Sequence, residues 1–286
     1  MDVLREFDPW RDPLCTCPPK LSLNPYTGCD HACVYCYITS YIPRAFECRP
    51  KTDLISRLRR DIEKVREGTL VSMSNSSDPY PHIERNLGLT RECLKLLSQK
   101  DLRVQIITKS DLVVRDLDLL SKMRSVVSFT LTTLDPLVSK RLEPGAPPPE
   151  RRLKALRKLT EAGLPVTVRL DPVILGLNDD EIERIVRSVA GVGAKHVTSS
   201  TFKPRPDSWH RIKLKFPKVA RELEPLYFEF GTKHRSSFYL PSHLREELMK
   251  RVRDACIANG LTFSSCREGL KKISTGDSCD GTHLIE

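Results

Sequence analysis

The sequence has no apolar run that approaches the ~20 residues needed to cross a bilayer. Its first six residues contain no apolar segment of the kind found in a secretory signal peptide. No stretch is of low complexity, and no repeat is visible apart from alternating strand and helix patterns. These absences argue against a membrane-spanning or secreted protein. We therefore expect a cytoplasmic protein with no membrane partner, in a compartment where thiols are normally reduced.

Ten cysteines in such a compartment need a role other than disulfide formation, and metal or cluster ligation is the leading one. We interpret Cys48, Cys93 and Cys256 as small buried apolar residues, and the last two lie in helical patterns. The other seven form two groups. Three lie close together at 29–36, and four lie toward the two ends of the chain.

Acidic residues are scarce in one region. The chain has 47 Lys and Arg against 37 Asp and Glu, a net charge of +10. Residues 203–253 hold 13 Lys and Arg against 6 Asp and Glu, so this segment alone carries +7. A local excess of this kind can attract a polyanion.

After Asn24, β-branched runs alternate with amphipathic helical patterns at 54–65, 153–159 and after Asn178, where Asn178 or Asp179 is the expected N-cap. Strands are predicted near 20–24, 68–74, 103–109, 125–132, 165–172 and 195–202. Strands that alternate with helices imply parallel βα units with right-handed crossovers. Six such units predict an α/β fold, a partial (βα)6 TIM-type barrel open on one side. Its chemistry is expected at the C-terminal ends of the strands.

Proline-rich breaks occur at 143–149 and 203–206, and the alternation stops after the second. We therefore divide the chain into an N-terminal extension (1–19), the partial barrel (20–202) and a C-terminal extension (203–286). The last is basic and aromatic-rich, has the character of a lid, and contains a predicted helix at about 243–259.

The strongest motif is Cys29-x3-Cys33-x2-Cys36. Three thiolates within eight residues can bind three irons of a cubane [4Fe–4S] cluster and leave the fourth iron open. Zinc is the alternative. Structural zinc prefers two separated pairs of ligands and closes all four positions. His31 as the fourth ligand would form a strained chelate, because it lies between the first two cysteines. The spacing therefore favours the cluster.

This spacing, with aromatic Tyr35 before the last cysteine, resembles the signature of the radical S-adenosylmethionine (SAM) superfamily. Further blocks at 24–29, 77–84, 108–111, 132–135 and 172–179 resemble the subgroup related to spore photoproduct lyase. The resemblance implies a [4Fe–4S] cluster, SAM bound at its open iron, and an electron donor of the flavodoxin or ferredoxin type. In such enzymes reductive cleavage of SAM gives a 5′-deoxyadenosyl radical, which abstracts hydrogen from a substrate.

The resemblance also implies residue roles near the first strands. Tyr35 would lie against the adenine, and its alternative role is packing under the cluster loop. Ser74, Asn75 and Ser76 stand where the superfamily often has a Gly-Gly-Glu-like segment that binds the SAM ammonium, a pattern from which this sequence departs. Asp78 would bind the ammonium or the substrate, or would serve only as an Asp-Pro turn device.

Further along the chain, Arg169 is the predicted partner of the methionyl carboxylate, because a basic residue inside a β-run needs a partner and Arg pairs well with carboxylates. Lys109 is a second basic residue at the catalytic rim. Thr130 would contact the ribose or pack inside the barrel. The segment that includes Gly176 and Asn178 would contact the adenine through backbone groups, with Gly176 allowing close approach.

The remaining cysteines are Cys15, Cys17, Cys266 and Cys279. If the two ends of the chain meet, these four would bind a second metal centre, either an auxiliary cluster or zinc, with His283 as a further ligand. They are otherwise unrelated thiols, or one of them donates hydrogen to a product radical, as the relationship to spore photoproduct lyase suggests.

The basic segment 203–253 also contains Trp209, Tyr227, Phe228 and Phe230. Basic grooves with stacking aromatics suit single-stranded or flipped nucleic acid, and the alternative is a lid whose aromatics form its core. We predict a radical SAM enzyme that acts on DNA or RNA, in lesion repair or base modification. The alternatives are a protein side chain or small metabolite as substrate, and a non-enzymatic, cluster-bearing nucleic-acid-binding protein.

Overall fold

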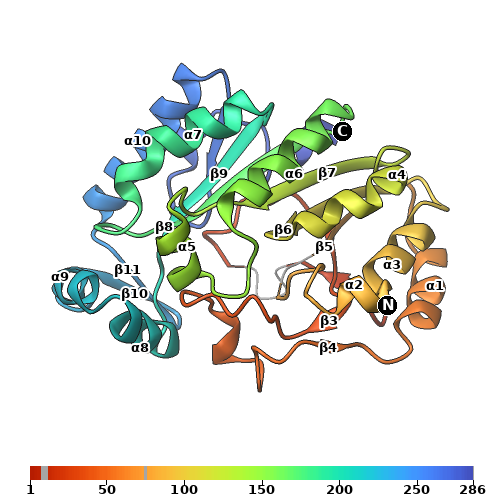
Figure 1. Ribbon diagram of the computed structural model, residues 1–286, viewed down its shortest axis with the longest axis horizontal. Coiled ribbons are helices and arrows are strands. Elements are labelled where there is room, and N and C mark those ends of the chain that lie inside the picture. The colour runs from red at the N-terminus through yellow and green to blue at the C-terminus, as the bar shows by residue number, and fades with distance from the viewer. Residues whose placement is uncertain (8–11, 74–75, 286) are drawn as a thin grey trace.

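A computed structural model describes residues 1–7, 12–73 and 76–285. Its main sheet contains eight strands: β1 (Arg5–Glu6), β2 (Leu21–Leu23), β5 (Leu70–Met73), β6 (Arg103–Thr108), β7 (Arg124–Thr130), β8 (Val166–Val173), β9 (His196–Thr201) and β12 (Thr262–Ser265). They are ordered β1-β2-β5-β6-β7-β8-β9-β12 (Figure 1). All neighbours from β2 to β12 are parallel, and β1 is antiparallel to β2. The six predicted strands and the α/β class are confirmed.

Amphipathic helices cover the outer face of this sheet (Figure 1). They are α1 (Leu54–Glu63), α3 (Leu89–Leu97), α4 (Leu117–Leu120), α6 (Pro149–Glu161), α7 (Ile182–Gly191) and α10 (Ser242–Ala258). The predicted apolar stripes are their buried faces, as in α7, where Ile182, Ile185 and Val189 are fully buried. Shorter helices lie in the loops between strands: η1 (Ile38–Ser40), α2 (Glu84–Leu87), η2 (Asp111–Asp116), α5 (Pro136–Leu142) and η3 (Asp179–Glu181). Two more, η4 (Lys271–Ile273) and η5 (Thr282–Ile285), follow the last strand, β12.

The two faces of the sheet differ in chemistry because side chains alternate along each strand. Val104 and Ile106 are buried and apolar. Gln105, Thr167 and Thr198 are equally buried but polar, and Gln105 and Thr198 hydrogen-bond to the C-terminal segment. The inner face is therefore a polar surface, the kind of lining that a hydrophilic cofactor needs.

The alternation of strand and helix does not stop at residue 203, so that prediction is wrong. After α8 (Pro206–Lys215), α9 (Pro217–Phe228) and the hairpin of β10 (Thr232–His234) and β11 (Ser237–Tyr239), α10 leads into β12, which pairs in parallel with β9. Strand β12 was missed because its sequence, Thr-Phe-Ser-Ser, has neither a β-branched run nor an apolar one. Within the described residues β1 and β12 do not pair with each other, so the sheet is open. The domain boundaries stay a prediction.

Asn178 stands at the N-cap position of η3, which leads directly into α7, but its side chain makes no capping hydrogen bond. The Asn178 side chain accepts from the N–H of Ile174 and donates to the carbonyls of Thr132 and Pro172, while Asp179 accepts from the N–H of Gly176. Helix α7 begins after Glu181, whose side chain makes no capping hydrogen bond. These polar side chains stabilise the loop before the helix rather than the helix itself.

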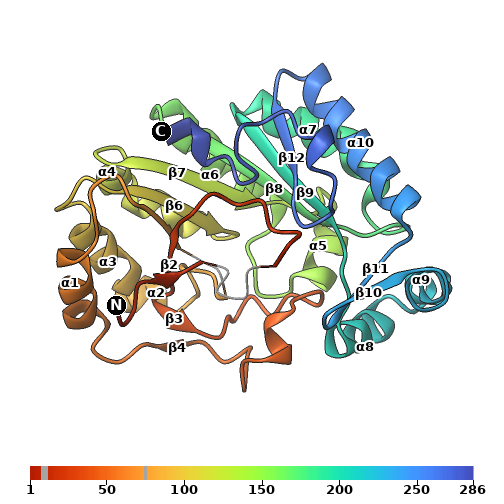
Figure 2. The same cartoon turned by 180° about the vertical axis from the view of Figure 1, so that it is seen from behind.

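Both ends of the chain lie across the polar face of the sheet (Figure 2). The first residues of the chain are held against α1. There a carboxylate oxygen of Asp61 accepts hydrogen bonds from the N–H groups of Asp2, Val3 and Leu4 at 2.7–3.0 Å. The C-terminal segment runs from β12 to η5, which packs beside β7. In the part of the chain that the structure describes, no helix is long and apolar enough to cross a membrane.

Candidate active site

The three motif cysteines lie on the loop of residues 28–37, called the cluster loop below, which follows β3 (Tyr26–Thr27). Gly28 begins it with φ +78°, and a Cβ there would lie 2.4 Å from the Glu47 carbonyl oxygen, so only glycine fits. The Cys29 N–H donates to Ala45 at 2.7 Å and the Val34 N–H to Leu142 at 2.8 Å. Backbone contacts with segments that are distant in sequence therefore fix the loop before any cofactor binds.

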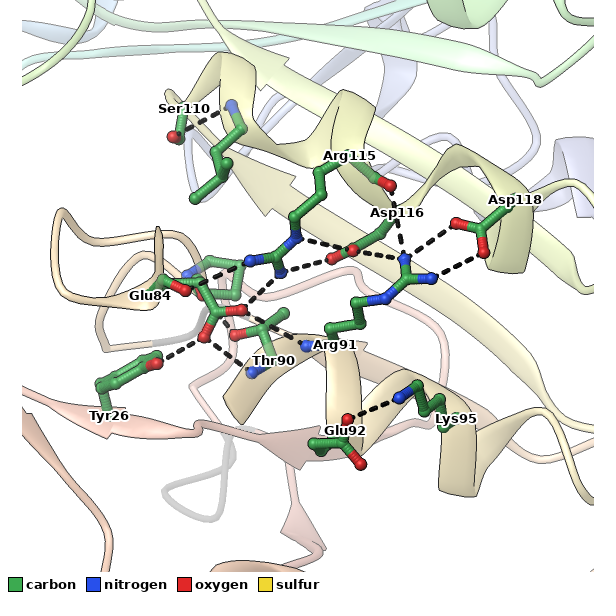
Figure 3. A network of polar contacts seen from close by, with 12 residues as sticks. Tyr26, Glu84, Thr90, Arg91, Glu92, Lys95, Ser110, Arg115, Asp116 and Asp118 are labelled. Atoms are coloured by element: carbon green, nitrogen blue, oxygen red, sulfur yellow. Dashed lines mark hydrogen bonds and ion pairs between the residues drawn. The ribbon is translucent and has the colours of Figure 1, made fainter. Parts of the chain in front are cut away.

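A buried polar network holds the strand that enters the cluster loop (Figure 3). The Tyr26 hydroxyl donates to Glu84, which is fully buried and also accepts from the Thr90 N–H at 2.8 Å. Arg115 pairs with Glu84 at 2.5 Å and with Asp116 at 2.9 Å. This network ties β3 to α2, α3 and η2, so the cluster loop starts from a rigid base.

The three thiols form a set suited to iron. Cys33 is buried, and Cys29 and Cys36 are half-buried. Burial raises the pKa of Cys33 and of Cys36, and the neighbouring thiols raise both further, because each thiolate repels the others. Three thiolates in mutual repulsion are stabilised by a cationic centre.

Within the described residues, no group of three or more His, Cys, Asp or Glu is arranged around a single metal ion. Zinc needs its ligands to converge on one point, whereas each cysteine of a cubane binds a different iron. A set of three thiolates on one loop fits a [4Fe–4S] cluster.

His31 pairs with Asp78 rather than completing a metal site. The distance from His31 Nδ1 to Asp78 Oδ2 is 3.4 Å. Burial alone would lower the pKa of His31, but Asp78 and Cys29 raise it to about 10. Burial would likewise raise the pKa of Asp78, but His31 and the hydrogen bonds from Thr108 and Lys109 lower it to about 2. The pair is thus charged, and it joins the cluster loop to the end of β6.

The Asp78 carboxylate is held by several neighbouring groups. Besides His31, its carboxylate accepts from the Thr108 hydroxyl at 2.6 Å, the Lys109 N–H at 2.8 Å and the Tyr80 N–H at 2.9 Å. These contacts agree with the turn-device alternative. A role in binding ammonium or substrate stays a prediction.

A second set of interacting polar side chains, formed by Tyr35, Glu143 and Arg152, lies near Cys33. The Tyr35 hydroxyl donates to Glu143, and Glu143 pairs with Arg152 at 2.6 Å, with both charged side chains at most 1% exposed. Lys109 Nζ lies 5.5 Å from the centre of the Tyr35 ring. Burial would lower the pKa of Lys109, but Cys33 and Glu143 raise it, so its ammonium stays charged. Lys109 therefore places a positive charge beside the cluster loop.

The predicted SAM contacts on β7 and β8 are neighbours. Thr130 and Arg169 are paired in the register of the two strands. Arg169 is half-buried and has the acidic partner expected for a basic residue inside a strand, namely Asp171 at 2.6 Å. Thr130 is buried. Contacts of Arg169 with a carboxylate of SAM and of Thr130 with ribose stay predictions.

The other residues predicted to contact SAM lie in two segments of the chain. Ser74 and Asn75 lie outside the described residues, and the N–H of Ser76 donates to Asn24 at 3.2 Å. Gly176 has φ +73°, a left-handed conformation that favours glycine. The Asn178 side chain is fully buried and bonded within the protein, as described above. Whether Ser76, Gly176 and Asn178 contact SAM stays a prediction.

Sequence reasoning missed three residues that hold the cluster loop: Glu143, Arg152 and Arg211. Arg211, on α8, donates to the carbonyl oxygens of Val34 (2.9 Å) and Cys36 (2.5 Å). Arg152 had a readable signal, because it shares the apolar face of α6 with Leu156 and Leu159 and so had to be buried. Arg211 had none, since its partners are 175 or more residues away in the sequence.

The four leftover cysteines are not all in contact with one another. Cys17 and Cys279 meet with their sulfur atoms 3.1 Å apart, and Cys15 contacts Cys17. Cys266 instead contacts Arg169. His283 bonds to Ser278 and stacks edge-on against His196. An auxiliary cluster or zinc at these residues stays a prediction.

The model of the radical SAM superfamily matches residues 23–189, more than half of the chain. The protein therefore belongs to the radical SAM superfamily, whose members use a [4Fe–4S] cluster and SAM. It is an enzyme of that superfamily, which leaves the non-enzymatic alternative without support.

Its fold is similar to that of spore photoproduct lyase. A variant of that enzyme with bound AdoMet and dinucleoside spore photoproduct matches with a TM-score of 0.68 and 20% identity, over 88% of this chain and 79% of that one. The radical SAM methyltransferase TsrM of Kitasatospora setae matches with a TM-score of 0.58 and 12% identity, over 92% and 58% of the two chains. At these identities the similarity shows a shared fold.

Curated relatives agree with the family. A Methanocaldococcus jannaschii protein described as uncharacterized is 33% identical over 175 residues, which are 57% of this chain and 63% of that protein. A Mycobacterium tuberculosis protein, also described as uncharacterized, is 28% identical over 82% of this chain and 73% of its own length. The radical SAM Nα-GlyT isomerase of Pseudomonas phage M6 is 23% identical over 89% of this chain and 55% of its own.

Proposed function

We propose that this enzyme abstracts a hydrogen atom from a nucleic acid, in the repair of a DNA lesion or the modification of a base. Cys29, Cys33 and Cys36 would hold a [4Fe–4S] cluster, which together with SAM and an electron from a flavodoxin or ferredoxin would supply the radical chemistry. The similarity of the fold to an enzyme crystallised with a dinucleoside lesion supports a nucleic-acid substrate.

The chain's own residues would orient SAM and exclude water. Lys109 and Arg169 present cationic groups at the ends of β6 and in β8, where a carboxylate of SAM can be bound. Arg211 bonds the loop carbonyls, and the buried pair of Glu143 and Arg152 supports Tyr35 from behind. With the loop held from both sides, reactive species would form in a fixed and shielded place.

The observation that carries the substrate proposal is an exposed aromatic pair at the end of the cluster loop. Tyr37, the residue after Cys36, is 46% exposed, and Tyr41 is 50% exposed. Their ring centres are 6.1 Å apart, and the Arg205 guanidinium lies 5.4 Å from the Tyr37 ring. Exposed aromatic rings next to an arginine can stack on bases while the guanidinium contacts a phosphate. We call these three residues the stacking patch.

The C-terminal extension divides its aromatic side chains between core and surface. Trp209 and Tyr227 are buried and pack edge-on at 5.8 Å, as in the lid alternative, whereas Phe228 is 41% and Phe230 66% exposed. Lys213 and Lys215 on α8 are also exposed. Helix α8 also supplies the contacts to the cluster loop, so its charge lies on the element that adjoins the site.

The first experiment is anaerobic reconstitution with iron and sulfide, reduction, and measurement of 5′-deoxyadenosine from SAM, with and without single-stranded DNA, duplex DNA, RNA or small metabolites. We expect nucleic acid to stimulate turnover, with deuterium from a labelled nucleotide appearing in 5′-deoxyadenosine. Stimulation by peptides or metabolites but by no nucleic acid would contradict the substrate proposal and leave the superfamily assignment intact.

The second experiment tests the stacking patch by oligonucleotide binding at several salt concentrations. Tyr37→Ala combined with Tyr41→Ala should weaken binding by roughly 10-fold to 100-fold, since stacking contributes about 1–3 kcal/mol per base. Phe230→Ala is the matched control, because Phe230 is 66% exposed but lies beyond α9. The affinity should fall as salt rises. Equal binding by both variants would contradict the role of the patch.

A further inference from the structure

The two ends of the chain bring two cysteines into contact. Cys17 and Cys279 are 262 positions apart, yet their sulfur atoms are 3.1 Å apart. Cys279 is buried, whereas Cys15 and Cys17 are half-buried and so lie nearer to solvent. Neither Cys17 nor Cys279 belongs to the motif that binds the cluster.

Contacts that do not involve sulfur hold the two segments in this position. The Lys20 ammonium pairs with Asp280 at 2.5 Å, and both side chains are 2% exposed. Gln105 on β6 accepts from Lys20 at 3.2 Å and donates to the Asp280 carbonyl at 3.0 Å. Thr198 on β9 donates to the Cys279 carbonyl at 2.9 Å. The sheet thus places the backbone on each side of the sulfur pair.

The N-terminal side is fixed at its other end too. Asp12 is buried, accepts from the Leu14 N–H at 2.9 Å and pairs with Arg267 at 3.2 Å. Cys15 and Cys17 therefore lie on a short span between two anchors, Asp12 and Lys20. A disulfide needs its sulfur atoms to move from contact to a bond of about 2.05 Å, a change that side-chain rotation can supply when the backbone is already in place.

We propose that Cys17 and Cys279 are a redox-sensitive modification site that forms a reversible disulfide between the N-terminal and C-terminal segments. The oxidant is a low-molecular-weight disulfide. One protein thiolate attacks it, forms a mixed disulfide and releases one small thiol. The other protein thiolate then attacks the protein sulfur of the mixed disulfide and releases the second small thiol. Two protein thiols are oxidised by two electrons, and one small disulfide is reduced to two thiols, which take up the protons.

The crosslink would fasten the two segments that cover the polar face of the sheet. It would close a loop that includes almost the whole chain and reduce the freedom of the unfolded state. In a reducing compartment, protein disulfides of this kind are commonly redox-sensing rather than permanent. This modification does not depend on the substrate, so it stands or falls separately from the proposed function.

The local chemistry sets the expected rate. Contact with Cys15 lowers the pKa of Cys17, but Cys279 and burial raise it by more, so its thiol is mostly protonated near neutral pH. Because the thiolate is the attacking species, exchange should be slow and should accelerate with rising pH. Long incubation is therefore part of the test.

The test uses the anaerobic holoenzyme in glutathione buffers of increasing oxidised fraction, followed by alkylation and trypsin digestion. We expect a mass loss of two hydrogen atoms per chain and a crosslink between the peptides 12–20 and 273–286, with the cluster absorbance unchanged. Dithiothreitol should reverse it. Cys15→Ser should keep the crosslink, Cys17→Ser and Cys279→Ser should each abolish it, and Cys48→Ser is the matched control that should keep it.

Three results would overturn the proposal. One is the absence of this crosslink at every glutathione ratio while the cluster stays intact. Another is a crosslink that joins Cys15 rather than Cys17 to Cys279 in the wild-type chain. The third is stoichiometric zinc or additional iron that protects these thiols from alkylation, which would assign them to a metal centre. Melting curves of Cys17→Ser that match the reduced wild type show that the variant is folded.

Discussion

The two groups of cysteines are built by opposite means. Cys29, Cys33 and Cys36 lie within eight residues on one loop, while Cys17 and Cys279 come from the two ends of the chain. Each group nevertheless has a lysine beside it, buried in the case of Lys20 and half-buried in the case of Lys109. Burial would lower the pKa of both lysines, but Cys33 raises that of Lys109 and Cys17 raises that of Lys20. Each set of cysteines thus has a lysine ammonium close to its sulfur atoms, whether the cysteines are near or distant in sequence.

The difference lies in what fixes the sulfur atoms. In the cluster loop, backbone hydrogen bonds from Cys29 and Val34 to the carbonyls of Ala45 and Leu142 set the path of the chain. At the terminal pair, the position depends on side chains, above all Lys20 and Asp280. Local spacing can encode the first arrangement, and only the completed sheet can produce the second.

The largest expected effect is on the cluster loop. Cys33→Ala should remove nearly all cluster iron and all 5′-deoxyadenosine formation, because no other thiol of the loop can replace it. Cys279→Ser should leave both essentially unchanged. Iron and sulfide analysis together with the cleavage assay checks this contrast. If the two variants lose iron equally, the two cysteine groups are not independent.

The next effect concerns the buried pair behind Tyr35. Glu143→Gln leaves Arg152 charged, buried and unpaired, so we expect a loss of about 3–5 kcal/mol in the free energy of unfolding. Urea unfolding of the apoprotein measures it. The control is Glu246→Gln, which removes a solvent-exposed partner of Lys250 and should change the free energy of unfolding far less. A change at Glu143 no larger than the control would show that the pair does not stabilise the fold.

A smaller effect is expected where the N-terminal segment begins. Burial would raise the pKa of Asp61, but three backbone N–H groups lower it, so its contribution to stability is present above about pH 4 and is lost as the pH falls through the lowered value. Asp61→Asn should cost about 1.5–3 kcal/mol at pH 7. The difference between variant and wild type should shrink below pH 4 in urea titrations. A difference that does not vary with pH would contradict the ionised carboxylate.

The smallest effect is expected at the contact between α8 and the cluster loop. Arg211→Lys retains a charge but loses the fork that spans the Val34 and Cys36 carbonyls, so about 1 kcal/mol of stability should be lost. The variant should also release iron to a chelator several times faster than wild type. Lys213→Arg, at an exposed position on the same helix, is the control and should release iron at the wild-type rate.

Much of the fold could be predicted because its signals are local. Runs of β-branched residues indicate the strands Val104–Thr108 and Val166–Leu170. The spacing of apolar residues such as Ile182 and Ile185 indicates the helix that contains them. Strand β12 could not be predicted, because it owes its structure to pairing with β9. Asn178 stands before a helix like a capping residue, but its side chain donates hydrogen bonds to the carbonyls of Thr132 and Pro172 instead.

The sequence by itself determined the chemistry that three closely spaced cysteines can support, because three thiols on one short loop are neighbours in any fold. It also determined the order of strands and helices, since their periodicities are local. Only the tertiary structure decided which charges stand behind that loop, as with Glu143, Arg152 and Arg211, and that Cys17 meets Cys279. Such contacts join residues far apart in the chain, and their positions exist only after the sheet and its helices have packed.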